Sequence, residues 1–197
     1  MNKTIIRHSS FIILSSLLAG CFNEPEPAYK SVPAENRVYL SDKGLKALPQ
    51  VNAKADYLNL DRNQLEKADG VEKLTELKWL RLNDNRLSAL PDLKGLVRLR
   101  RIYLKNNRFT AVPETLKDLP SLTDVDLSGN PVKEIPAWLA EKKGLKNLSF
   151  SRTQLTKLPA NLEAWKSLQS LQLGDLNISA EEMARIRSAL PNVAIVF

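Results

Sequence analysis

Apolar residues recur along most of the chain with the spacing L-x-x-L-x-L-x-x-N-x-L, usually followed by x-x-L-P. The clearest copy runs from Leu77 to Leu87 and continues to Leu90 and Pro91. The second residue of the L-x-L pair, or its equivalent, falls at positions 40, 60, 82, 104, 127, 150, 173 and 195, so successive copies lie 20 to 23 residues apart. A nearly constant period over this length predicts a repeat architecture.

Each part of the pattern predicts a structural element. The L-x-L alternation predicts a short strand whose leucines point into a core, and stacked copies would form one parallel sheet along a concave side. The asparagine is expected to turn the chain and to hydrogen-bond the backbone of adjacent coils. Short convex segments are expected after Pro91, Pro113, Pro136 and Pro159. Because one coil cannot bury its own apolar face, stability is expected to come from stacking.

The repeat resembles that of the leucine-rich-repeat family over about 160 residues. The resemblance implies an α/β fold, a leucine-rich-repeat solenoid in the form of a short curved horseshoe. A parallel β-sheet would line the concave face, with short helical or 3-10 segments on the convex face. Residues 37–197 are predicted to hold about seven repeats, including a C-terminal cap over 179–197.

The C-terminal end of the array departs from the pattern. Thr153 and Leu176 replace the last two asparagines, so the amide ladder is expected to end at Asn130. Ser179-Ala-Glu-Glu182 matches a capping box and predicts a helix through about residue 190, followed by a closing strand over 193–195. The C-terminal Phe is expected to cover the last open coil.

The first 20 residues have the composition of a signal peptide. Lys3 and Arg7 precede an apolar run from Phe11 to Ala19, which is too short for a permanent membrane-spanning helix, since that needs about 20 apolar residues. The run leads to Leu-Ala-Gly before Cys21 and resembles the lipobox of bacterial lipoproteins. The resemblance implies cleavage before Cys21 and lipidation there by a diacylglyceryl group and an acyl group, a combination that anchors a protein stably.

Phe22 stands where an aspartate commonly signals retention in the inner membrane, so the lipobox implies the outer membrane of a Gram-negative host. Residues 22–36 contain three prolines and no apolar periodicity, which predicts a disordered tether. Segment 21–36 is therefore interpreted as the lipidated cysteine and its tether. The alternative is a plain secretory signal that contains a cysteine by chance.

Cysteine and histidine are almost absent. Cys21 and His8 are the only ones, and both belong to the export region. A processed chain would therefore lack Cys–His zinc sites, Ser-His-Asp triads and CxxC redox motifs. We expect no metal, no cofactor and no enzymatic activity.

The charge balance is mildly basic. The net charge of the chain is +7, and removal of residues 1–20 takes away Lys3 and Arg7 and leaves 27 basic against 22 acidic side chains. A basic excess favours acidic glycans, anionic lipid or acidic proteins as partners. Nucleic acid is not expected, because an exported chain rarely meets it and no nucleic-acid-binding motif is present.

Candidate binding residues occupy the outward positions beside the strand leucines, because proteins of the resembled family usually bind through the concave sheet. Aromatic and basic residues are concentrated at these positions in the first four coils, whereas the last coils carry Asn, Ser, Gln and Gly. Exposed aromatic and arginine side chains dominate interface energies. The predicted partner-binding residues are Tyr39, Tyr57, Trp79, Arg81, Arg101, Tyr103 and Lys105. Alternatively, such aromatics simply suit strands and the arginines stack on them.

Two acidic residues, Asp124 and Asp126, are outward neighbours on one strand. A carboxylate pair could act in glycoside hydrolysis. Beside Arg101 and Tyr103 of the preceding coil, however, a cross-strand ion pair and a hydrogen bond explain them better.

These observations lead to three functional hypotheses. The preferred one is a membrane-anchored module that binds a protein partner through the concave face. The alternative is recognition of an anionic envelope glycan, such as lipopolysaccharide or peptidoglycan, by aromatic stacking and arginine pairing. The third, an enzyme that uses carboxylates alone, is disfavoured.

Overall fold

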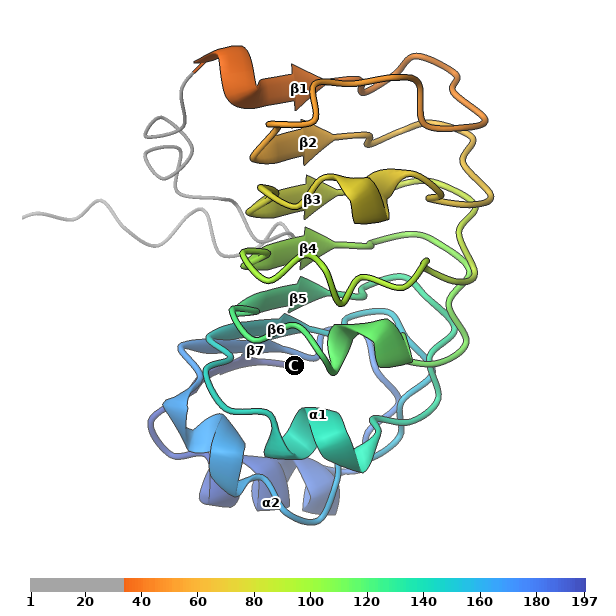
Figure 1. Cartoon of the computed structure of the whole chain (residues 1–197). Coiled ribbons are helices and arrows are strands. Elements are labelled where there is room, and N and C mark those ends of the chain that lie inside the picture. The colour runs from red at the N-terminus through yellow and green to blue at the C-terminus, as the bar shows by residue number, and fades with distance from the viewer. Residues whose placement is uncertain (1–33) are drawn as a thin grey trace, which may run out of the picture.

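The computed structural model describes residues 34–197, and in this range eight short strands form one open parallel sheet in chain order. Figure 1 shows the strands stacked one beside the next from β1 onward. The strands are β1 (Arg37–Tyr39), β2 (Tyr57–Asn59), β3 (Trp79–Arg81), β4 (Arg101–Tyr103), β5 (Asp124–Asp126), β6 (Asn147–Ser149), β7 (Ser170–Gln172) and β8 (Ala194–Val196). This is the solenoid that the repeat spacing predicts.

Short helical segments connect the strands. They are the 3-10 helices η2 (Ala34–Asn36), η3 (Val71–Lys73), η4 (Glu114–Leu116) and η5 (Glu163–Ser167) and the α-helices α1 (Ala137–Glu141) and α2 (Ala180–Ala189). Within residues 34–197, no helix combines the length and the apolar character needed to cross a membrane.

A short 3-10 helix precedes the first strand. Residues 34–36, assigned to the tether from sequence, form η2, and the Asn36 carbonyl accepts a hydrogen bond of 3.1 Å from the Asp56 N–H. That bond joins the residue before β1 to the residue before β2. The predicted signal peptide, Cys21 and the rest of the tether lie outside the described residues.

The core is a single stack of apolar side chains shared by all coils. In register, Leu58 pairs with Leu80 and Leu80 with Ile102, and none of the three is exposed. Trp165 is also fully buried, and its Nε1 donates a 2.9 Å hydrogen bond to the Leu139 carbonyl of the neighbouring coil. Each coil thus completes the core of the next.

The asparagine ladder forms as predicted. The Asn85 amide nitrogen donates to the Leu60 carbonyl at 3.0 Å and to the Leu82 carbonyl at 3.1 Å, while its oxygen accepts from the Leu65 N–H at 3.1 Å. Equivalent bonds are made by Asn63, Asn107 and Asn130. Thr153, at the next position, bonds only the Phe150 carbonyl of its own coil at 2.8 Å, so the ladder ends where expected.

The C-terminal cap contains the predicted helix and strand, with one difference. The Ser179 hydroxyl accepts from the Glu182 N–H at 3.2 Å, which is half of a capping box. The Glu182 carboxylate does not return to Ser179; it accepts from the Leu158 N–H at 2.8 Å and from Arg185 at 2.7 Å. An acid expected to close its own helix therefore ties the cap to the preceding coil.

The ladder yields a stability prediction. Asn107→Ala removes its hydrogen bonds to the carbonyls of Leu82 and Leu104, which keep their bonds from the Asn85 and Asn130 amides, and it leaves the buried Leu87 N–H without a partner. We expect a loss of about 2 kcal/mol in the free energy of unfolding, because an orphaned buried group costs about 1–3 kcal/mol. Urea denaturation measures this loss. The matched control is Asn177→Ala at an exposed position, and equal midpoints for the two variants would contradict a structural role for the ladder.

Candidate functional site

The first and third residues of the strands form two parallel columns on the concave face, opposite the leucine core. The register aligns Arg37, Tyr57, Trp79 and Arg101 in one column and Tyr39, Asn59, Arg81 and Tyr103 in the other. The structure therefore brings six of the seven predicted binding residues together in these two columns, and Lys105 follows two residues after β4.

Aromatic rings of the first three coils contact one another. The ring centroids of Tyr39 and Tyr57 lie 5.2 Å apart with planes tilted by 43°. Those of Tyr57 and Trp79 lie 5.9 Å apart in an edge-to-face arrangement at 89°. Both separations are within the range in which aromatic pairs attract, so the three rings form a continuous ladder along the stack.

Two guanidinium groups extend this ladder toward β4. Cζ of Arg101 lies 5.1 Å from the centre of the Trp79 ring, and Cζ of Arg81 lies 5.5 Å from that of Tyr103. Both distances allow cation–π attraction. Arg81 is also held by Asp61, whose carboxylate accepts from Nε at 2.8 Å. Asp61 is the positioning residue that sequence reasoning did not assign, although it stands in the outward position after β2.

The structure corrects the expectation that the aromatic rings of the concave face are all exposed. Tyr39 is 52% exposed, but Tyr57, Trp79 and Tyr103 are only 4%, 7% and 4% exposed. None of the three belongs to the leucine core. Part of their burial comes from contacts between adjacent coils, whose strands lie about 4.8 Å apart. They are therefore stacked parts of the concave wall, and Tyr39 with the half-buried Arg81, Arg101 and Lys105 provides its accessible groups.

The two acidic residues of β5 are engaged within the sheet. Asp124 lies 3.8 Å from Nε of Arg101, as expected, and also accepts from Asn147 at 2.6 Å and from the Thr123 hydroxyl. Asp126 accepts from the Ser128 N–H at 2.9 Å. Burial raises the pKa of Asp126, and the hydrogen bond from Ser128 opposes that shift. Intramolecular contacts thus account for both carboxylates.

A groove of about 790 Å³ adjoins the concave face at the edge where strands β3 to β6 begin. Its lining includes Trp79 and Arg101 of the predicted site together with Lys78, Arg100 and Lys146. Sequence reasoning missed these three cations because they precede the strands and lie outside the two alternating columns. The repeat could have revealed them, because all three occupy the same position in their coils.

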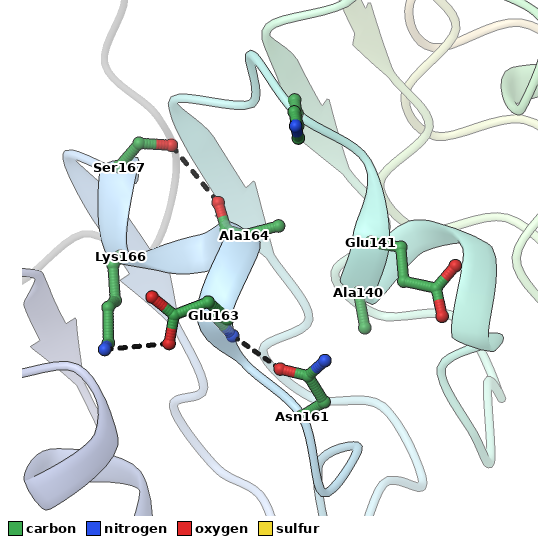
Figure 2. A pocket seen from close by; sticks show the side chains of 8 residues that line it. Ala140, Glu141, Asn161, Glu163, Ala164, Lys166 and Ser167 are labelled. Carbon is green, nitrogen blue, oxygen red and sulfur yellow. Dashed lines mark hydrogen bonds and ion pairs between the residues drawn. The ribbon is translucent and has the colours of Figure 1, made fainter.

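A second hollow lies between α1 and η5. Figure 2 shows its lining, which encloses about 530 Å³. Several of its polar groups already bond one another: Lys166 lies 2.8 Å from Glu163, and the Glu163 N–H donates to Asn161 at 2.9 Å. Nearby, Trp138 is partly buried against the core and donates to Glu114 at 2.8 Å, as a packing residue would.

In the part of the chain that the structure describes, no group of three or more His, Cys, Asp or Glu side chains is placed to hold a metal ion.

Comparison with known proteins agrees with this architecture. Residues 75–132 match the family model described as leucine rich repeat. The solved structure of a leucine-rich-repeat protein from Leptospira interrogans is similar, with 32% identity and a TM-score of 0.61. The similarity covers 79% of this chain but only 38% of that one. No curated protein sequence matches. The fold is a leucine-rich-repeat solenoid, an architecture whose concave surface commonly binds proteins.

The buried carboxyl of Asp126 gives a pH prediction. A pKa raised in the folded state means that this state binds the proton more tightly, so the contribution to stability is full below the ordinary carboxyl pKa and is lost as pH rises through the raised value. Asp126→Asn replaces the carboxyl by a neutral amide, so the variant does not lose this stability as pH rises. Urea denaturation should show a variant more stable than the parent at about pH 7 and nearly equal to it at about pH 3. A variant less stable than the parent at both pH values would contradict the assignment.

Proposed function

We propose that the chain is a lipid-anchored module of the bacterial cell envelope that recognises a protein partner through the concave face of its solenoid. The observation that carries the proposal is the continuous array of aromatic and basic side chains on β1 to β4. Its members are Tyr39, Tyr57, Trp79, Arg81, Arg101, Tyr103 and Lys105. Its accessible members include Tyr39, Arg81 and Arg101, and tyrosine and arginine are among the residues that supply most of the binding energy at protein interfaces.

The rigidity of the array supports binding. Arg81 lies between Asp61 and the Tyr103 ring, and Arg101 between Asp124 and the Trp79 ring. Side chains already held in place lose less conformational freedom when a partner binds, which leaves more of the contact energy for affinity. Tyr39, at the N-terminal end of the array, is the most accessible of its rings.

The anchoring part of the proposal rests on sequence. The apolar run before Cys21 and the lipobox pattern support cleavage and lipidation there, and the residue after it supports an outer-membrane location in a Gram-negative host. The aromatic array begins on β1, the strand nearest in sequence to this anchor.

A second candidate function is recognition of an anionic envelope glycan, such as lipopolysaccharide or peptidoglycan. The observation in its favour is that guanidinium groups lie beside aromatic rings, as at Arg101 and Trp79. Rings could stack on sugars while the guanidinium groups pair with phosphate or carboxylate. The extent of the array along four coils favours a protein.

The concave face can be tested by site-specific cross-linking. A photoreactive amino acid in place of Tyr39 should cross-link an envelope protein in intact cells, whereas one in place of Gln172, in the same column on β7, should not. Trp79→Ala with Arg81→Ala should abolish the Tyr39 cross-link, because the double variant removes a stacked ring and a guanidinium. Ser170→Ala with Gln172→Ala is the matched control on the C-terminal coils, and thermal unfolding checks that each variant is folded.

Two outcomes would count against this surface. Unchanged cross-linking in a folded Trp79→Ala, Arg81→Ala variant would refute the assigned residues. Binding to purified lipopolysaccharide that weakens steeply with salt, without any cross-linked protein, would favour the glycan alternative.

The anchor has its own test. Cys21→Ser should abolish metabolic labelling with palmitate and leave the signal peptide uncleaved, seen as a larger chain on a denaturing gel, because the lipidated sulfur and the cleavage that depends on it are lost. A Phe22→Tyr variant, which keeps the cysteine, is the control. Labelling that persists in Cys21→Ser would contradict lipidation at this residue.

A further inference from the structure

The groove beside the concave face carries an excess of positive charge. Four cationic side chains line it, and Asp124 is its single carboxylate. The four cations are Lys78, Arg100, Arg101 and Lys146. An excess of positive charge in a groove attracts anionic groups and raises their rate of association.

The cations of the groove are not all satisfied within the fold. Lys78 lies 3.3 Å from Asp56, and Arg101 lies 3.8 Å from Asp124. Arg100 and Lys146 are exposed, and across residues 34–197 their side chains make no ion pair or hydrogen bond. Asp124 is already occupied by Asn147 and the Thr123 hydroxyl. Positive charge therefore remains available to a ligand at Arg100 and Lys146.

The backbone holds these residues in a straight row. The Lys78 carbonyl accepts from the Arg100 N–H at 2.8 Å, the Arg100 carbonyl from Thr123 at 2.8 Å, and the Thr123 carbonyl from Lys146 at 2.7 Å. Each step is one coil, or about 4.8 Å, so the row from Lys78 to Lys146 extends for about 14 Å. These backbone hydrogen bonds continue the sheet pattern by one residue before the strands and so fix the spacing of the row.

We propose that this groove binds an extended acidic segment of the protein partner, an inference that rests on the proposed function. A row of charges over about 14 Å suits carboxylates distributed along a chain better than one compact anion, because an extended peptide places same-side carboxylates about 7 Å apart. The uncharged side chains of Thr123, Asn147 and Gln169 lie among the cations and can bond peptide groups. The groove shares Trp79 and Arg101 with the concave array, so one partner can contact both.

The test uses two synthetic peptides and the full chain. The first is a fluorescein-labelled peptide of five Glu-Ala repeats, and the second is its Gln-Ala counterpart. Fluorescence anisotropy should show binding of the Glu-Ala peptide alone, and binding should weaken as salt rises from about 0.02 M to about 0.2 M. Arg100→Glu with Lys146→Glu should weaken it by about tenfold or more, since two attractive contacts become repulsive.

The matched control is Arg108→Glu with Lys133→Glu, which makes the same change in net charge at two exposed positions outside the groove. This variant should bind the Glu-Ala peptide within about twofold of the parent, apart from general charge effects. Far-ultraviolet circular dichroism establishes that both variants are folded; the side chains of Arg100 and Lys146 bond no group of the fold, so their replacement should leave it intact.

Several results would overturn the groove assignment. They are failure of the parent to bind the Glu-Ala peptide, equal weakening by both double variants, and binding only of an anionic oligosaccharide such as oligogalacturonate, which would assign the groove to a glycan. If the peptide fails but Tyr39 still cross-links a protein, the groove proposal falls and the binding module stands. If the peptide binds and no protein is cross-linked at Tyr39, the groove proposal stands and the proposed binding module falls.

Discussion

The whole structure depends on one constraint: a coil of about 22 residues buries its leucines only against the coils on either side. Polar backbone groups at the turn must be satisfied at the same time, and the amides of Asn63, Asn85, Asn107 and Asn130 satisfy them. Together, the shared core and the ladder permit one register. Because that register is repeated, the residues between the leucines become two straight columns on the opposite face.

The side-chain contacts within the columns follow from the regular stacking of the coils. Rings at equivalent positions in successive coils come close enough to stack, as Tyr57 and Trp79 do, and a guanidinium one coil further along lies over a ring. Asp61 then holds Arg81 from the preceding coil. The basic row before the strands arises in the same way and meets the columns at Trp79 and Arg101. Two neighbouring surfaces of different chemistry therefore share a scaffold that needs no rearrangement to present them.

The sequence predicted the features that the repeat period determines. It did not predict those that depend on how closely the side chains of neighbouring coils approach one another. The strands, their register, the end of the ladder at Asn130 and the ion pair of Arg101 with Asp124 follow from spacing. The burial of Tyr57, Trp79 and Tyr103 does not, because it depends on how closely side chains of neighbouring coils converge. Nor did alternation reveal that the residue before each ladder asparagine adopts a left-handed conformation, with φ of +54° at Arg62 and +69° at Gly129. At Gly129 an added Cβ would lie 2.1 Å from the Asn106 side-chain oxygen, so this coil has room for glycine alone unless Asn106 moves.

The central claim is that recognition takes place on the concave face of the first four coils. The most direct measurement is a structure of the chain bound to the protein that cross-links at Tyr39. The account predicts a partner whose buried contacts lie on the columns of β1 to β4, with Arg81 and Arg101 at the centre. A partner seated on the convex segments around α1 and η5, with the columns left open to solvent, would contradict it.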